Sequence, residues 1–393
     1  MRAESQKPFQ KIVLCEWGMH QEVLYTYLMH FLPLTNKISV CCYRWVACQM
    51  QEIIWPIHIE WITEDASTAY VEACQKTLVD CDFAIITTLP SKKSRLDNLQ
   101  FRKPVFLLIH NTCFQLWQDF RRQEHLDQWF QIRQFLKWIT FRLSGEAYRQ
   151  KQWVQKSNNI IFSSYNMKKY YLENTSSNSW PNPMVIPSGH HISIQINKYQ
   201  SEKLKIGIPG NINFLKKDYK VLSDGLKYFA ESHRGDAELI FMGKCDASVR
   251  KLIRNMETGF SGSGINIVTY PDYLPHKEYV TILHSLDLMI WNFKKIKPYG
   301  PFNEIFGYTT ESGAVGDMIK YGIPSVIPDF YPIARELEKL VVRFSDSHSL
   351  ATAITKIETR KKIFSNPADL SSWQYPNIGK CILQQMKQHV EKA

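Results

Sequence analysis

Short apolar runs alternate with helix-like periods twice along the chain. The runs are apolar at almost every position, which is typical of parallel strands that are covered by helices on both faces. Between the runs, apolar residues recur with helical spacing. The pattern predicts strands at 11–17, 37–43, 57–63, 83–89, 104–110, 159–165 and 184–187, and then at 204–208, 238–242, 265–270, 287–291 and 325–328. It predicts helices at 21–32, 67–78, 166–172, 219–229, 247–256 and 312–321, with one or two more within 114–150.

This alternation predicts an α/β protein with two Rossmann-like domains whose parallel sheets face a central cleft. A Ser/Asn/Pro-rich loop at 174–182 and a polar stretch up to 202 separate the two patterns. We expect a first domain over residues 1–190 and a second over 200–370. In open α/β sheets, ligands bind beyond the carboxyl ends of the strands. Candidate site residues should therefore follow strands directly.

Composition narrows the class of protein. Hydrophobic residues make up 44% of the 393-residue chain and charged residues 22%, which is typical of a globular protein. The apolar runs are shorter than the roughly 18–20 residues that cross a bilayer, and the first ten residues are polar. The nine cysteines form no CxxC pair and no metal-finger spacing. We expect reduced thiols, no metal site and a cytoplasmic location.

Positive charge is concentrated in one part of the chain. The formal net charge is +11, and residues 101–170 hold twelve Lys and Arg against four Asp and Glu. Such a block favours a polyanionic partner, which is a phosphorylated ligand, an anionic membrane or a nucleic acid.

Aromatic residues are interleaved with these cations between residues 117 and 153. An amphipathic helix of this composition can lie in an anionic membrane interface. The alternative is a helix that packs on its own domain and exposes a basic face to solvent. No nucleic-acid-binding motif accompanies the block, so we expect no nucleic-acid partner.

The first candidate site segment follows the predicted strand at 204–208. Gly210 there allows a ligand to approach the backbone closely, and Lys216 and Lys217 precede a helix where they can meet phosphate groups. The segment is not a P-loop, because GxxxxGK[ST] does not occur. The alternative is a solvated loop with surface lysines.

The second candidate segment is the predicted helix at 312–321. Thr310 or Ser312 can cap it, and Gly313 in its first turn leaves backbone N–H groups to hold an anion. Asp317 lies one turn further, where its carboxylate can accept two hydroxyl hydrogen bonds, as a ribose offers. Gly322 ends the helix. The alternative is an ordinary capped helix with a solvent-facing Asp317.

The order of these residues resembles the donor-binding half of the GT-B glycosyltransferases, most of all the retaining group of bacterial polysaccharide and glycolipid transferases. In that group a phosphate-binding lysine follows a glycine by six residues, as Lys216 follows Gly210. An acidic residue five positions before Gly-x-Pro holds the ribose hydroxyls, and Asp317 occupies that place before Gly322.

The resemblance covers most of the chain. Residues 11–18 are similar to the first strand and its glycine-bearing loop, which implies a donor-binding role for Gly18. His110 stands at the strand end where the family often carries an active-site histidine; His20, His190 and His191 are weaker candidates. The chain after Ser372 and Trp373 is similar to a terminal helix, here 371–393, that packs back onto the first domain.

Two positions depart from the family pattern. Asn211 stands where the family has an arginine, so either Lys217 supplies the second cation or no residue does. Thr309 stands at the upstream acidic position, which leaves the roles of Glu304 and Glu311 open.

The resemblance implies a glycosyltransferase that moves a sugar from a nucleotide-diphosphate sugar to the hydroxyl of a glycan or lipid-linked acceptor in cell-surface polysaccharide synthesis. It implies retention of configuration, no metal and no further cofactor. Tyr299 is a candidate for the sugar pocket. The alternatives are a nucleotide-sugar epimerase on the same fold and a non-catalytic binding subunit.

Overall fold

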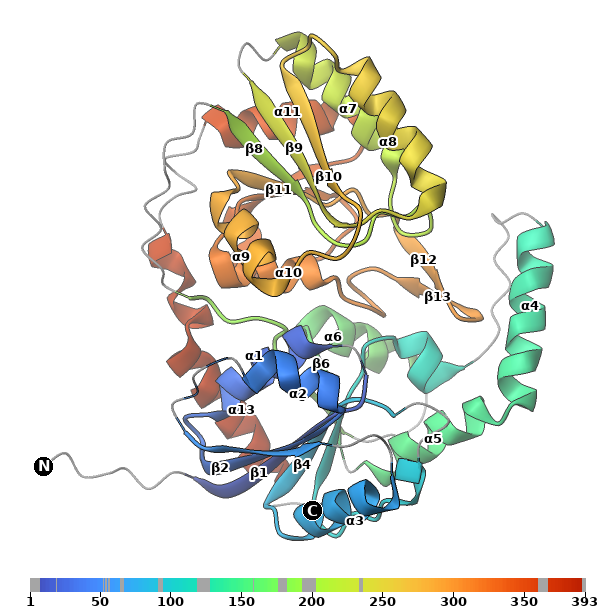
Figure 1. The fold of residues 1–393 in the computed structure, drawn as a ribbon, viewed down its shortest axis with the longest axis vertical. Helices are drawn as coiled ribbons and strands as arrows, with labels where there is room; N and C mark the ends of the chain where they lie inside the picture. Colours follow the sequence, from blue (N-terminus) through green and yellow to red (C-terminus); the bar gives the residue numbers. More distant parts are fainter. Residues whose placement is uncertain are drawn as a thin grey trace, which may run out of the picture. The chain divides into compact units, whose positions relative to one another are not determined.

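The computed structural model describes residues 8–18, 20–51, 53, 55, 57–63, 67–90, 95–118, 128–157, 159–175, 182–192, 203–232, 236–359 and 367–390. They form two compact units, each built on a parallel sheet (Figure 1). Unit 1 contains the chain up to Ser188, the short segment Tyr299–Asn303 and the chain from Tyr375. Unit 2 contains Gly189–Pro298 and Glu304–Gln374.

The sheet of unit 1 has seven strands in the order β3-β2-β1-β4-β5-β6-β7, and every neighbouring pair is parallel. Successive strands are added towards one side of the sheet from β1 to β3 and towards the other side from β4 to β7, which makes the carboxyl ends of β1 and β4 the switch point of the sheet. The strands are β1 (Phe9–Glu16), β2 (Thr35–Cys42), β3 (Ile59–Thr63), β4 (Phe83–Thr88), β5 (Val105–Leu108), β6 (Asn159–Phe162) and β7 (Asn182–Val185).

Helices cover this sheet, and the last helix, α13, covers the edge strand β7 through Gln385. Gln385 accepts a hydrogen bond from the N–H of Val185 at 3.1 Å and donates one to its carbonyl at 3.2 Å. It thereby occupies the backbone groups of the edge strand β7. The helices are α1 (Gln21–Phe31), α2 (Arg44–Gln51), α3 (Thr68–Val79), α4 (Gln128–Leu143), α5 (Glu146–Lys156), α6 (Tyr165–Asn174) and α13 (Tyr375–Val390), with short turns η1 (Arg95–Asn98) and η2 (Cys113–Trp117).

The sheet of unit 2 has six strands in the order β10-β9-β8-β11-β14-β15, again all parallel. Its switch point lies between β8 and β11. The strands are β8 (Leu204–Ile208), β9 (Ala237–Lys244), β10 (Ile265–Tyr270), β11 (Leu288–Ile290), β14 (Ser325–Pro328) and β15 (Val341–Phe344). A separate two-stranded sheet pairs β12 (Ile296–Tyr299) with β13 (Phe302–Ile305).

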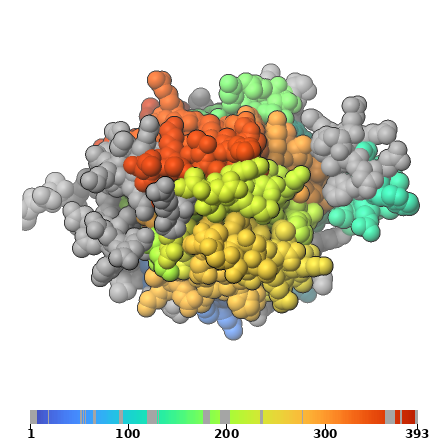
Figure 2. Space-filling view, turned by 90° about the horizontal axis from the view of Figure 1, so that it is seen from above, coloured from blue at the N-terminus to red at the C-terminus, as the bar shows by residue number. Residues whose placement is uncertain are grey.

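Alternate residues of these strands enter two different cores, as the pleat requires. Leu239 and Phe241 of β9 join one core, whereas Ile240 and Met242 join the other. The first core lies under α7 (Tyr219–Ser232), α8 (Ala247–Gly259) and α11 (Ser347–Thr359), which lie side by side in Figure 2. The second lies under α9 (His276–Ser285), α10 (Gly313–Tyr321) and the turns η3 (Arg335–Leu340) and η4 (Pro367–Trp373).

The expected α/β class with two parallel-sheet units is confirmed. Most expected strands and helices are present within a few residues of their predicted bounds. The sequence pattern missed α2, α9, the β12–β13 pair, β15 and α11. In the part of the chain that the structure describes, no helix combines the length and the apolar character needed to span a bilayer.

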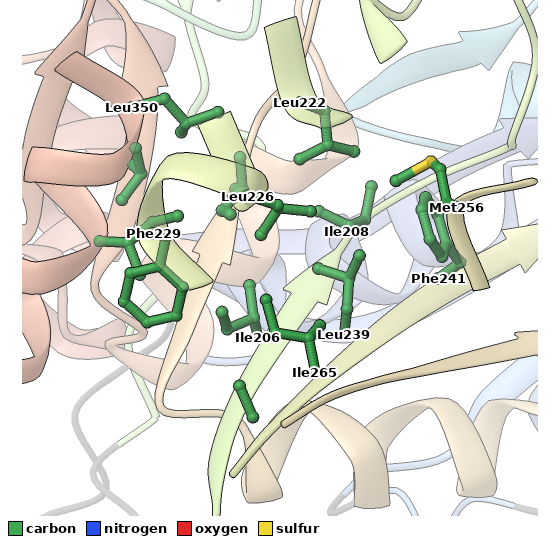
Figure 3. Close-up of a cluster of buried hydrophobic side chains, with 14 of the residues drawn as sticks. Ile206, Ile208, Leu222, Leu226, Phe229, Leu239, Phe241, Met256, Ile265 and Leu350 are labelled. Carbon is green, nitrogen blue, oxygen red and sulfur yellow. The ribbon is translucent and has the colours of Figure 1, made fainter. Parts of the chain in front are cut away.

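Phe229 tests the packing of unit 2. Figure 3 shows it with Leu222 and Leu226 of α7, in the same core as Ile206 and Ile208 of β8. We expect Phe229→Ala to lower the free energy of unfolding by about 3–5 kcal/mol in urea titrations, because the fully buried ring leaves a cavity. The exposed neighbour Lys227→Ala is the control and should change it by less than about 0.5 kcal/mol. Equal effects would contradict this packing.

Candidate functional site

Two chain segments lie side by side beyond the carboxyl ends of β8 and β11 in unit 2. Lys217 pairs with Phe293 in an isolated bridge. On either side of it, Lys294 N–H donates to the Lys216 carbonyl at 3.0 Å, and Asp218 N–H donates to the Asn292 carbonyl at 2.7 Å. These bonds fix the predicted lysine loop at the switch point, where open α/β sheets bind their ligands.

Two glycines shape the start of this loop. Gly210 has a φ of +78°, a conformation that side chains disfavour. Gly243 of β9 lies against it: a Cβ on Gly243 would come within 2.4 Å of the Gly210 carbonyl oxygen. Ile212 N–H then donates to the Lys244 carbonyl at 3.1 Å. The glycine at 210 was predicted, whereas the need for one at 243 follows only from the backbone approach.

The two predicted lysines differ in their surroundings. Lys216 is half-buried, and its N–H donates to Asn213 Oδ1 at 3.1 Å. Lys217 is only 2% exposed; its ammonium donates to the Pro209 carbonyl and lies 5.2 Å from the centre of the Phe293 ring. Burial, and then the charge of Lys216, lower the pKa of Lys217 to about 7. Burial also lowers the pKa of Lys216, against the opposing charge of Asp246.

The helix α10 begins as its sequence predicts. Ser312 is the N-cap, and its hydroxyl accepts a hydrogen bond from Ala314 N–H at 3.3 Å. Gly313 in the first turn is exposed. At the other end, Gly322 takes the left-handed conformation and its N–H donates to the Met318 carbonyl. The predicted N-cap and C-terminal glycine of α10 are thus both present.

Aromatic rings connect this helix start to the lysine loop. Tyr331 Oη accepts a hydrogen bond from Ser312 N–H at 3.3 Å. The Tyr331 ring lies 6.2 Å from that of Phe293, over which the ammonium of Lys217 sits. Phe293 stacks in turn on Phe306 at 4.8 Å. The lysine loop and the start of α10 therefore adjoin one aromatic cluster beyond the carboxyl ends of the strands.

Asp317 has a partner that the sequence did not indicate. Its Oδ2 accepts a 2.6 Å hydrogen bond from the hydroxyl of Tyr279 on α9. Burial lowers the pKa of the nearby Lys320, and the charge of Asp317 opposes that shift. Because α9 was not predicted, no sequence signal could have identified Tyr279.

Asn211 and Thr309, which depart from the family pattern, both make hydrogen bonds within unit 2. Asn211 Nδ2 donates to Tyr273 Oη at 3.3 Å. Thr309 is fully buried, and its hydroxyl accepts a 2.6 Å hydrogen bond from Ile305 N–H. Thr309 therefore holds the turn before α10. The buried Lys297 and Glu304, which the sequence analysis left unassigned, lie on the β12–β13 pair just before that turn.

A second cluster forms at the switch point of unit 1, around Glu16. This fully buried carboxylate accepts hydrogen bonds from Thr87 Oγ1 at 2.6 Å, Thr88 Oγ1 at 2.9 Å and Gly18 N–H at 2.8 Å. Burial raises the pKa of Glu16, although these bonds and the charge of His20 oppose the shift. A Cβ on Gly18 would lie 2.3 Å from Thr88 Cγ2, so a larger residue there would displace Thr88.

His110 joins the same cluster. Its Nε2 donates to the Thr87 carbonyl at 2.7 Å, so Nδ1 is an acceptor when the ring is neutral. The His110 ring stacks on that of His20 with the ring centres 4.7 Å apart. The backbone N–H of His110 donates to Gln115 Oε1 at 2.8 Å. The structure thus brings the weaker candidate His20 next to His110, which the sequence could not show.

Three other predicted residues lie elsewhere. Tyr299 belongs to unit 1, where its ring packs edge-on against Phe114 at 5.2 Å; its place in a sugar pocket stays a prediction. His191 Nδ1 donates to the Ile319 carbonyl at 3.1 Å. Burial lowers the pKa of its neighbour His190 to about 4. Over the described ranges, no three His, Cys, Asp or Glu side chains gather where they could hold a metal ion.

The buried ammonium of Lys217 predicts a pH-dependent stability. Its pKa is about 7 in the folded chain and near 10.5 in the unfolded one, so between these values the unfolded state alone keeps the proton. Stability then rises with pH. We expect the wild type to gain up to about 1.4 kcal/mol per pH unit over Lys217→Met between pH 7 and 10 in urea titrations. Exposed Lys220→Met should follow the wild type, and parallel curves for Lys217→Met would disprove the shift.

Comparison with known proteins supports the fold. No family model and no curated protein matches the sequence. The structure of Anabaena HepE in complex with UDP and glucose matches 96% of this chain and 100% of its own, with a TM-score of 0.55 and 14% identity. The Escherichia coli trehalose-6-phosphate structure bound with UDP-2-fluoro glucose matches 96% and 99%, with a TM-score of 0.56 and 10% identity.

The lipopolysaccharide outer core galactosyltransferase WaaB matches 96% of this chain and 99% of its own, with a TM-score of 0.50 and 12% identity. Identities this low establish the fold and not the substrate. The chain has the fold of the GT-B glycosyltransferases.

Proposed function

We propose that this protein is a glycosyltransferase that moves a sugar from a nucleotide-diphosphate sugar to an acceptor hydroxyl. The observation that carries the proposal is the meeting of Lys216, Lys217 and the start of α10 around one aromatic cluster at the switch point of unit 2. Buried cations beside a helix N-terminus suit a diphosphate. Complexes of two structural neighbours hold UDP or a UDP-sugar, which supports this donor class.

The proposed chemistry is electrostatic. As the bond between sugar and diphosphate breaks, negative charge builds on the leaving diphosphate. Lys216, Lys217 and the positive N-terminal end of the α10 dipole would stabilise that charge without a metal ion or another cofactor. Gly210, which carries no side chain, would let the phosphates approach the loop backbone.

Asp317 would bind the nucleoside part of the donor. Its carboxylate can accept hydrogen bonds from the ribose hydroxyls, and Tyr279 fixes its orientation through the 2.6 Å hydrogen bond. The base, the sugar and the acceptor are not specified by these contacts.

His110 is the proposed catalytic residue of unit 1. Its Nε2 proton is held by the Thr87 carbonyl, so Nδ1 is the atom that would accept a hydrogen bond from a substrate hydroxyl. The loop at Gly18 lies beside it through Glu16 and Thr87. We propose retention of configuration from the resemblance and assign no protein nucleophile.

The helix α4 supports a membrane-linked acceptor. Trp129, Ile132, Leu136 and Leu143 are exposed on it at helical spacing, and Trp129 and Leu143 are 74% and 84% exposed. Exposed Arg133, Lys137 and Arg142 accompany them. We propose that α4 lies in an anionic membrane interface, as a peripheral enzyme acting on lipid-linked saccharides at the cytoplasmic face would require. Residues 119–127 of the predicted basic block lie outside the described residues.

Nucleotide binding tests the donor site. Among UDP, GDP, ADP and CMP, one at about 100 times its dissociation constant should stabilise the protein by about 2.7 kcal/mol, seen as a raised unfolding midpoint. Asp317→Ala should weaken that nucleotide about tenfold or more, because the ribose loses a charged acceptor. Tyr279→Phe keeps the carboxylate and should lose less. If no nucleotide shifts the wild-type midpoint, the proposed site is wrong.

A nucleotide sugar that contains the bound nucleotide distinguishes the glycosyltransferase from the two alternatives, an epimerase and a binding subunit. A transferase should release the nucleotide, by slow hydrolysis or by transfer to an added glycan. An epimerase should need no acceptor and should release the free sugar or its epimer. A non-catalytic binding subunit should show neither nucleotide binding nor hydrolysis or transfer.

Vesicle flotation tests the role of α4. We expect binding to vesicles of phosphatidylglycerol but not of phosphatidylcholine, and weaker binding as salt rises. Leu136→Ser and Leu143→Ser together should reduce binding about tenfold or more, since both side chains would leave the interface. Leu172→Ser on α6, also exposed, is the control. Binding that is unchanged in the α4 variant would exclude this surface.

A further inference from the structure

Lys297 is a buried cation outside the lysine loop. It lies on β12, is 7% exposed, and its ammonium lies 4.9 Å from the centre of the Phe306 ring. Phe306 stacks on Phe293, and the ammonium of Lys217 lies over the Phe293 ring. Two stacked rings therefore hold two buried lysines, one from the loop after β8 and one from the segment after β11.

Charges reach Lys297 from two sides. The charge of Lys216 lowers the pKa of Lys297, and the fully buried Glu304 on β13 raises it. Burial is the largest effect, and together they place the pKa of Lys297 at about 8. Asp246 is the acidic group that acts on Lys216. Asp246 thus opposes the shift at Lys216, and Glu304 opposes the shift at Lys297.

The backbone holds β12 beside the lysine loop. Lys294 N–H donates to the Lys216 carbonyl, and Phe306 N–H donates to the Lys295 carbonyl, each at 3.0 Å. The β12–β13 pair is therefore tied at its base to the segment that carries Lys216 and Lys217. An ammonium desolvated there gains most from an anion with several oxygen acceptors.

We propose that Lys297 binds the phosphate groups of the nucleotide donor together with Lys216 and Lys217. The inference rests on the proposed function and adds a third cation to its phosphate site. Glu304 is a positioning residue that keeps Lys297 charged. Because a phosphate oxygen favours the ammonium form, binding near pH 8 draws a proton onto Lys297.

Calorimetric titration with UDP, UMP and uridine tests the role of Lys297. Lys297→Met should weaken UDP about ten- to a hundredfold and leave uridine unchanged, because only the phosphate contact is lost. Lys295→Met, an exposed lysine two residues away, is the matched control and should bind UDP as the wild type does. Lys297→Gln removes the charge with a polar chain of similar length and takes the place of Lys297→Met if that variant does not fold.

The pH profile tests Glu304. Without its charge the pKa of Lys297 falls, so the part of the pH-dependent loss of UDP affinity that Lys297→Met abolishes should occur at lower pH in Glu304→Gln. The loss that comes from Lys217, whose pKa is about 7, should remain in all three proteins. Uridine affinity should not change with pH in any of them. If UDP affinity depends on pH in Glu304→Gln as it does in the wild type, Glu304 has no role in phosphate binding.

Wild-type affinity for UDP in folded Lys297→Met or Lys297→Gln would overturn the inference while the donor site stands. Failure of the wild type to bind any of UDP, GDP, ADP and CMP would instead overturn the proposed function itself.

Discussion

The structure depends on the cost of burying charge at the ends of parallel strands. Both faces of each sheet are covered by helices, so polar groups can gather only beyond the strand ends. In unit 2 the result is an ammonium, that of Lys217, closed in by Phe293 and the Pro209 carbonyl, with its pKa brought down to about 7. Such an arrangement costs stability in the free protein and is balanced when an anion binds.

The two units use the same position of the fold with opposite charge. In unit 2 the switch point gathers lysines around aromatic rings, which suits a diphosphate. In unit 1 it gathers the buried carboxylate of Glu16, two threonines and the stacked pair His20 and His110. Glu16 is satisfied by its own neighbours, so this cluster is built to hold the glycine loop and the histidines in place.

Periodicity predicted the parts of the fold that have local signals. The β8 strand and the α10 helix, with Ser312 and Gly322 at its ends, follow from apolar runs and capping residues. Of the site, the lysine loop was predicted because a glycine and two cations are adjacent in sequence. Lys297, Glu304, Tyr279 and Gly243 could not be found this way, since each reaches the site through pairing or packing between distant segments. The short hairpin of β12 and β13 carries no periodic signal of its own.

A crystal structure of the protein with UDP tests the central claim most directly, because it shows where the diphosphate lies. The account predicts the diphosphate between Lys216, Lys217 and the first turn of α10, with the ribose hydroxyls on Asp317. A diphosphate bound at any other place, with the ammonium of Lys217 still closed in by Phe293 and far from a phosphate, would contradict it.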